Sequence, residues 1–184
     1  FAFELMPSAF SFMLSLMRLL FNLDTKDYTS TEHVFSRPSV RAIIIKDGRV
    51  GMVHSLKYDY YKFPGGGIEQ GESNEQALIR ETREEAGLVV VPSSIKEYGN
   101  VHRVSKSDQK GIDIFVQDNF YYLCDVAEGQ ALPQFTENEK KEEFIPCFVD
   151  LNEAIRVNEK YVKENSSDSM IERELRVMRM IADT

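Results

Sequence analysis

Short runs of apolar and β-branched residues, separated by turn residues, recur along most of the chain. The run over residues 39–46 (SVRAIIIK) is followed by Asp47-Gly48, a pair typical of tight hairpin turns, and then by a returning run over residues 49–55. These features predict a β-hairpin. Similar runs predict further strands over residues 88–91, 95–104, 114–126 and 144–149, whereas the polar stretches 22–38 and 127–143 predict connecting segments.

The clearest predicted helix extends from Ser73 to Ala86. Ser73 and Gln76 form the S-x-x-Q pattern of a capping box at its start. Gly87 follows its end, where a left-handed cap is expected. On a helical wheel, apolar residues and Thr82 fall on one side and glutamates on another.

Two more helices are predicted towards the end of the chain. Asp150 is expected to cap a helix that continues to about Lys163. The last helix is expected to open with Ser169 and Glu172 as a second capping box, and an apolar stripe runs along it. Mixed strands with a few helices predict an α+β fold in which helices pack on a mixed β-sheet.

The chain of 184 residues is long enough for one domain with a sizeable core. Residues 31–184 are expected to form this domain, and residues 1–30 an N-terminal extension. The uncharged run from Leu5 to Met17 is too short to span a bilayer, which takes about 20 apolar residues. Met17 could be the natural start, which would make residues 1–16 non-native and dispensable. The alternative is an apolar helix packed on a partner subunit, as in a homodimer, and the sequence leaves both open.

The composition narrows the classes of function. A formal net charge of −8, with lysines and arginines scattered along the chain, argues against a duplex nucleic acid as partner. Cys124 and Cys147 form no cluster with histidines in the sequence, so a zinc site is not expected. They are expected to be buried, reduced thiols, which favours a cytoplasmic location.

Carboxylates gather on one arc of the predicted helix 73–86. Glu81, Glu84 and Glu85 fall within about 100° of arc, and like charges at this spacing destabilise a helix by a few tenths of a kcal/mol per pair. The helix comes shortly after a Pro-Gly-Gly-Gly loop, residues 64–67. A solvated acidic face would explain the charge but not this position. Clustered carboxylates beside a glycine-rich loop suit Mg²⁺, which takes oxygen ligands and bridges to phosphates.

The segment from Gly66 to Leu88, GGIEQGESNEQALIRETREEAGL, resembles the Nudix box, GX5EX7REUXEEXGU with U a bulky apolar residue. Thr82 stands where an apolar residue is expected, and we interpret this as a change in packing. The resemblance covers roughly residues 38–160 and implies a Nudix-like α/β/α sandwich. The positions that match are Gly66, Glu72, Arg80, Glu81, Glu84, Glu85, Gly87 and Leu88.

The resemblance implies roles for individual residues. Glu84 and Glu85 would be metal ligands, and Glu81 a further ligand or the base that orients water. The carbonyl of Gly65 would add a ligand, and Arg80 would hold a glutamate in place, with Glu84 in reach at i+4. A later carboxylate is expected to join the site. Glu139 is our choice, with Glu137, Glu142 and Glu143 as alternatives.

By the same resemblance, the protein is expected to be a magnesium-dependent hydrolase, with Mn²⁺ as a substitute, that cleaves a phosphoanhydride bond in a nucleoside diphosphate linked to another moiety. Tyr61 and Phe63 are candidates for stacking on its base, although strand alternation favours a core position for Phe63. The marks that separate substrate classes are absent, so the substrate stays unassigned. The alternative is a nucleotide-binding regulatory module without catalysis, which the retained glutamates disfavour.

Overall fold

The computed structural model describes residues 17–128 and 131–184, except for the side chains of residues 138 and 139. Residues 1–16 of the predicted N-terminal extension lie outside the described residues, whereas residues 17–30 are described. The domain boundary stays a prediction. Within the described ranges, no helix is both long and apolar enough to cross a bilayer. The strands are β1 Leu19–Asp24, β2 Val34–Ser36, β3 Ser39–Ile43, β4 Ile45–Lys46, β5 Arg49–Ser55, β6 Tyr60–Lys62, β7 Lys96–Lys106, β8 Ile114–Leu123 and β9 Phe144–Val149.

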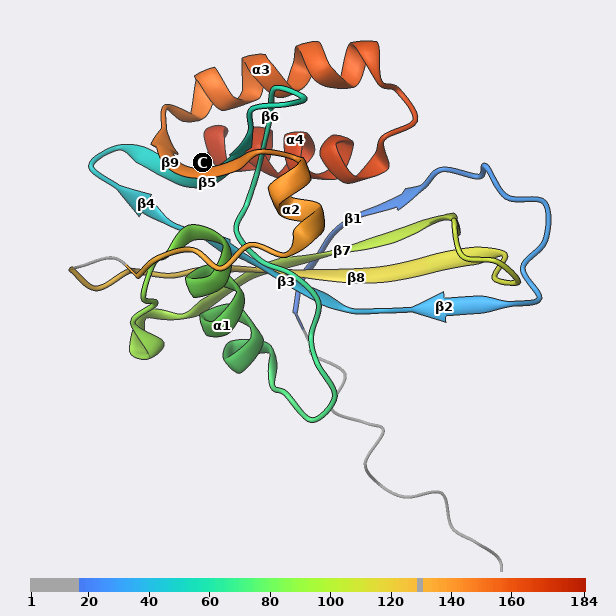
Figure 1. Ribbon diagram of the computed structural model, residues 1–184, viewed down its shortest axis with the longest axis horizontal. Coiled ribbons are helices and arrows are strands. Elements are labelled where there is room, and N and C mark those ends of the chain that lie inside the picture. Colours follow the sequence, from blue (N-terminus) through green and yellow to red (C-terminus); the bar gives the residue numbers. More distant parts are fainter. Residues whose placement is uncertain (1–16, 129–130) are drawn as a thin grey trace, which may run out of the picture.

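The strands form two sheets, and the helices cover them from both sides. In the first sheet β7 and β8 are antiparallel, β1 lies parallel to β7, and β2 and β3 lie parallel to β8. In the second, β5 pairs with β4, β6 and β9. Figure 1 shows α3 and α4 on one side of the sheets and α1 on the other, so the predicted α+β sandwich with a mixed sheet is confirmed. The helices are α1 Asn74–Ala86, α2 Glu137–Lys141, α3 Leu151–Glu164 and α4 Ser169–Ala182, with a short 3₁₀ turn at Pro92–Ser94.

Strand β3 separates the two halves of the core because its side chains alternate between the faces of the sheet. Val40 and Ala42 pack with Leu78 of α1 in one buried cluster. Ile43 points the other way, into a second cluster that includes Met178 of α4. Arg41 shares that second face, which places an arginine under α4.

The hairpin and the box helix form as predicted. Asp47 and Gly48 both have positive φ, 51° and 72°, which is the conformation of a type I′ turn. Ser73 and Gln76 make both hydrogen bonds of the capping box, and Gly87 ends α1 in the left-handed conformation at φ 65°. Asp150 caps α3, also as predicted.

Four local predictions were wrong. Residues 22–38 are not merely a connection, because β1 and β2 pair with the first sheet; as short edge strands they are half exposed and lack a clear apolar alternation. Residues 88–91 make only an isolated bridge, from Val90 to Val126, before Pro92 interrupts the pairing. The stretch 127–143 contains the short helix α2. Helix α4 is capped by Asp168, whose carboxylate accepts hydrogen bonds from two backbone N–H groups, and not by Ser169.

Candidate active site

Helix α1 presents two contrasting faces. Leu78 and Thr82 are fully buried against the sheet. The hydroxyl of Thr82 has no hydrogen-bond partner among the described residues, so this side chain acts as an apolar one. The departure from the box pattern at Thr82 is therefore a change in packing, as expected.

Arg80 ties the acidic face together. Its guanidinium makes a two-pronged contact with Glu72, with both N···O distances 2.8 Å, and also donates to the carbonyl of Gly67. One nitrogen reaches Glu81 at 2.7 Å and Glu84 at 3.3 Å. The hydrogen bond from Arg80 lowers the pKa of Glu72. The predicted contact with Glu84 is present, and the fork also fixes the loop before the helix to its acidic face.

Glu85 turns away from this group into the protein. It is buried, and its carboxylate accepts hydrogen bonds from the Lys62 ammonium at 2.6 Å and the Gly65 N–H at 2.9 Å. Burial raises the pKa of Glu85, and the charges of Lys62 and Arg41 oppose that rise. The helical pattern alone does not predict a cation beside Glu85. Lys62, which is 23 positions away in the sequence, supplies one.

The glycine loop lies directly against these carboxylates. A Cβ on Gly66 would come within 2.4 Å of a Glu81 oxygen, and one on Gly65 within 2.1 Å of the Val40 carbonyl. Gly65, which has positive φ and faces backbone atoms, therefore requires glycine, whereas a side chain at Gly66 would displace the carboxylate of Glu81. The carbonyl of Gly66 accepts a hydrogen bond from Val40 N–H, whereas we find no such bond to the carbonyl of Gly65 among the described residues. The role of the Gly65 carbonyl as a ligand stays a prediction.

The predicted metal ligands do not form a closed cage. Within residues 17–128 and 131–184, no three Asp, Glu, His or Cys side chains are close enough together to hold a metal ion. Glu81 and Glu84 share Arg80, and Glu85 is paired with Lys62. The donor set still suits a hard divalent cation, since it consists of carboxylate oxygens beside a flexible glycine backbone.

The candidates for a later carboxylate are now distinguishable. Glu142 is half-buried and accepts a hydrogen bond from the hydroxyl of Tyr60, which holds it beside β6. Glu137 is exposed and pairs with Lys140, and Glu143 is an exposed residue at positive φ. The Glu139 side chain lies outside the described residues, so its assignment stays a prediction.

The two aromatic candidates have different surroundings. Phe63 is fully buried and packs edge-to-face on Tyr121, so it is a core residue and its prediction as a substrate contact was wrong. Tyr61 is half-buried and stacks on His54, with ring centroids 4.2 Å apart. Its predicted contact with substrate remains a prediction.

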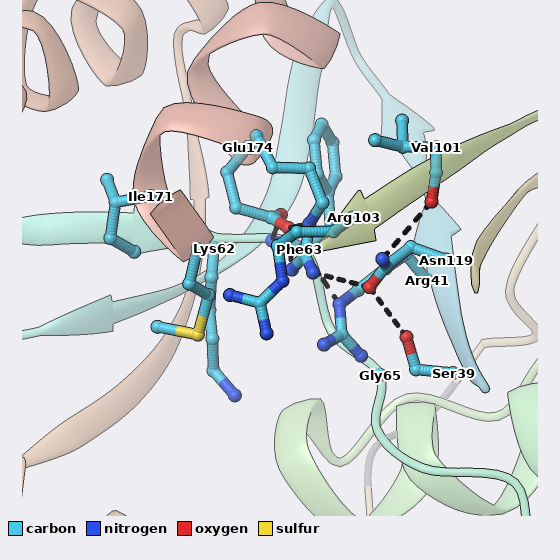
Figure 2. A network of polar contacts seen from close by, with 12 residues as sticks. Ser39, Arg41, Lys62, Phe63, Gly65, Val101, Arg103, Asn119, Ile171 and Glu174 are labelled. Carbon is cyan, nitrogen blue, oxygen red and sulfur yellow. Dashed lines mark hydrogen bonds and ion pairs between the residues drawn. The ribbon is translucent and has the colours of Figure 1, made fainter. Parts of the chain in front are cut away.

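A buried polar network below α4 was missed from the sequence (Figure 2). Glu174, which is fully buried, accepts hydrogen bonds from the Phe63 N–H at 2.9 Å, the Tyr121 hydroxyl at 3.0 Å and the neighbouring Arg173. Arg41 lies 3.8 Å from the same carboxylate. The network therefore anchors the strand that leads into the glycine loop. Its signal was the spacing of Glu174 with Ile171, Leu175 and Met178 on the apolar stripe.

A profile of the NUDIX domain matches residues 35–172 of the chain. The chain belongs to the Nudix family. The matched range includes the whole of the box helix, its glycine loop and strands β3 to β9. It also includes the last two residues of β2, the connection between α3 and α4 and the first turn of α4, which lie outside the range suggested by the sequence alone.

Similar proteins were found among curated sequences and solved structures. An RNA pyrophosphohydrolase of Hydrogenovibrio crunogenus is 39% identical over 64 residues, which is 34% of this chain and 38% of that protein. One of Acinetobacter baylyi is 46% identical over 54 residues, 29% of this chain and 32% of that protein. The chain thus matches about a third of the length of these relatives. A MutT NUDIX hydrolase from Burkholderia pseudomallei has a TM-score of 0.48 at 19% identity, over 64% of this chain and 85% of that one.

Proposed function

We propose that the protein is a magnesium-dependent hydrolase that cleaves a phosphoanhydride bond in a nucleoside diphosphate linked to another moiety. The observation that carries this proposal is the arrangement of three box glutamates around the glycine loop. The carboxylate of Glu81 lies against Gly66, and Glu81 and Glu84 both accept hydrogen bonds from Arg80. Glu85 accepts a hydrogen bond from the Gly65 N–H. Membership of the Nudix family supports the reaction class.

Each residue then has a separate task. Glu81, Glu84 and Glu85 would hold Mg²⁺, and Mn²⁺ is expected to substitute. The bound metal would supply Lewis-acid catalysis and neutralise phosphate charge. Glu81 is also a candidate to orient the attacking water, because its carboxylate lies against the loop. Arg80 holds two of the carboxylates in position, and Lys62 keeps a positive charge beside the third.

The curated relatives suggest which substrates to include in a test. Both are named RNA pyrophosphohydrolases. A 5′-polyphosphate on RNA contains the same phosphoanhydride chemistry as a nucleoside diphosphate derivative. Single-stranded RNA with such an end is therefore a second candidate substrate, whereas duplex nucleic acid remains disfavoured by the net charge of −8.

Two further proposals come from the sequence. These are a cytoplasmic location and a homodimer. A regulatory module that binds nucleotides without hydrolysis is the alternative function. Glu81, Glu84 and Glu85 are all retained in the sequence, which favours the enzyme.

The deciding experiment is a substrate screen. Nucleoside diphosphate derivatives and RNA with a 5′-triphosphate are incubated with the protein, with and without Mg²⁺, and released phosphate and nucleotides are identified. Hydrolysis of a member of the panel in Mg²⁺ alone supports the proposal. Saturable nucleotide binding without turnover of any member, with or without Mg²⁺, would instead establish the regulatory module.

A further inference from the structure

A cavity of about 480 Å³ opens on the far half of the first sheet, away from α1. Its floor comes from β2, β7 and β8, and one wall comes from the connection between α3 and α4 at Ser167 to Ser169. The volume is within the range of pockets that bind small ligands, roughly 300–1,000 Å³. None of the residues assigned to the metal site lines it.

Two arginines in this cavity have no acidic partner. Neither Arg37 nor Arg103 makes an ion pair within the described residues. Arg103 donates to the hydroxyl of Ser169 and the side-chain carbonyl of Gln117, and its buried Nε has no partner there. Burial lowers the pKa of Arg103 to about 10, with the charges of Arg173 and Arg41 acting in the same direction, so it is still charged at neutral pH.

Three acidic residues also line the cavity, Asp27, Asp108 and Asp168, and the first and the last of them accept hydrogen bonds from the protein. Asp168 caps α4 and accepts a hydrogen bond from the Tyr161 hydroxyl. Asp27 accepts from the backbone N–H of Lys106 and from Thr25. The cavity therefore offers two guanidinium groups that form no ion pair among the described residues, although acidic residues also line it. An anion is the ligand that this arrangement fits.

An aromatic surface lies next to the two arginines. Phe35 of β2 and Phe115 of β8 stack with ring centroids 5.6 Å apart and both are half-buried. The guanidinium of Arg103 lies 5.3 Å from the centre of the Phe115 ring. Flat apolar rings beside a cationic plane are a surface on which a nucleobase can stack.

Arg37 connects this cavity to the box. A Cβ on Gly67 would come within 2.3 Å of Arg37 Nε, so the side chain lies against the glycine loop. The next residue, Pro38, accepts a hydrogen bond from Ile68 N–H, and Gly67 itself accepts one from Arg80. The carboxylate of Glu81 lies against the adjacent residue, Gly66, in the same way as Arg37 lies against Gly67. Arg37 thus stands between the acidic group and the cavity.

We propose that this cavity binds the nucleotide unit of the substrate, with its base on Phe35 and Phe115 and its phosphate at Arg37. Arg103 completes the site beside the base. The remaining phosphates would extend past Gly67 to the box glutamates, and this part of the proposal rests on the proposed function. Binding of a nucleotide in the cavity is independent of that function, because a nucleoside monophosphate contains no anhydride bond to cleave.

The test is therefore binding of nucleoside monophosphates in EDTA, measured by isothermal titration calorimetry with each of the four common bases. Inorganic phosphate and the uncharged nucleosides are measured beside them. At least one monophosphate is expected to bind, and more tightly than either of its parts. Arg37→Met and Phe115→Leu are each expected to weaken that binding tenfold or more, and Arg49→Met, at an exposed arginine on β5, to leave it unchanged.

The outcomes separate the two proposals. Binding that is lost in the Arg37 and Phe115 variants, without hydrolysis of any substrate, upholds the cavity and refutes the proposed function. Hydrolysis whose KM is unchanged in both variants refutes the cavity and leaves the proposed function standing. Absence of binding for all four monophosphates at millimolar concentration also refutes the cavity. Circular dichroism of both variants confirms that they are folded.

Discussion

The ammonium nitrogen of Lys62 lies 2.6 Å from a carboxylate oxygen of Glu85. Both side chains are buried, and the same carboxylate also receives the N–H of Gly65. A metal ion that binds Glu85 would have to compete with Lys62 for its oxygens. Lys62 therefore acts as a counter-charge for the Glu85 carboxylate, because an unpaired buried carboxylate is costly.

Lys62→Met is expected to destabilise the metal-free protein, because Glu85 loses its partner. Breaking a buried ion pair costs up to about 3–5 kcal/mol. Mg²⁺ should restore more stability to this variant than to the wild type, since no lysine then competes for the carboxylate. At 100 times its Kd, a ligand contributes about 2.7 kcal/mol. Thermal unfolding in EDTA and in a series of Mg²⁺ concentrations measures both effects.

The control for this prediction is Lys46→Met, at an exposed lysine on β4. It should match the wild type with and without Mg²⁺. An equal gain in stability from Mg²⁺ for Lys62→Met and wild type would show that Glu85 does not bind the metal.

Arg80→Lys keeps the positive charge but removes the fork. The contacts to Glu72, Glu81, Glu84 and the Gly67 carbonyl need several nitrogens in one plane, which lysine lacks. We expect kcat/KM to fall roughly 10–100-fold and the Mg²⁺ half-saturation point to rise, as for other residues that orient metal ligands. Arg83→Lys, at an exposed position on the same helix, should leave both quantities unchanged. An Arg80→Lys enzyme with normal kinetics would show that the fork is dispensable.

Gly66→Ala tests the close approach of the loop to Glu81. The added methyl group would come within 2.4 Å of the carboxylate, so the Glu81 side chain must move. Gly66 does not have positive φ, so the backbone itself can accept alanine. We expect a large loss of turnover with a loss of stability of about 1 kcal/mol, a typical cost of a point mutation. Parallel losses, in which activity falls only because the protein unfolds, would contradict a specific role.

Glu174→Gln tests the network that anchors Phe63. Burial alone would raise the pKa of Glu174, but the charges of Arg173 and Arg41 and the hydrogen bond from Phe63 N–H outweigh it and lower the pKa. The stability that Glu174 contributes is therefore present above its ordinary pKa of about 4.3 and is lost as pH falls through the lower folded value. At pH 7 the variant should be less stable by about 3–5 kcal/mol.

The pH dependence checks the sign of this effect. The difference in unfolding free energy between wild type and Glu174→Gln should shrink as the pH falls from 7 towards 3, because glutamine does not titrate. Denaturant unfolding at each pH measures it. A difference that is constant with pH would mean that Glu174 is not ionised in the folded protein.

Much of this architecture could be predicted from local patterns. The hairpin at Asp47-Gly48, the capped helix from Ser73 and the strand 144–149 each depend on short-range rules, and each is present. The errors fall where local signals are weak. β1 and β2 are short edge strands whose pairing with β7 and β8 depends on residues far away in the sequence.

In the candidate site, too, the short-range features were predicted and the long-range contacts were not. Periodicity placed Glu81, Glu84 and Glu85 on one arc, and the predicted contact of Arg80 with Glu84 is present. The inward turn of Glu85 could not be predicted, because its partner Lys62 comes from another element of the fold. Phe63 was one of two aromatic candidates for the substrate, yet it belongs to the core. Pairings across the tertiary structure have no signature in a single sequence.

The most direct test of the central claim is a Mg²⁺ titration of hydrolysis by wild type and Glu81→Gln, starting from protein in EDTA and using a substrate identified in the screen. We predict no turnover in EDTA, restoration of wild-type activity by Mg²⁺, and for Glu81→Gln a higher half-saturation point with part of the rate recovered at high Mg²⁺. An unchanged half-saturation point with a depressed plateau would assign Glu81 to the base and not to the metal. Full activity of the wild type in EDTA would contradict the account.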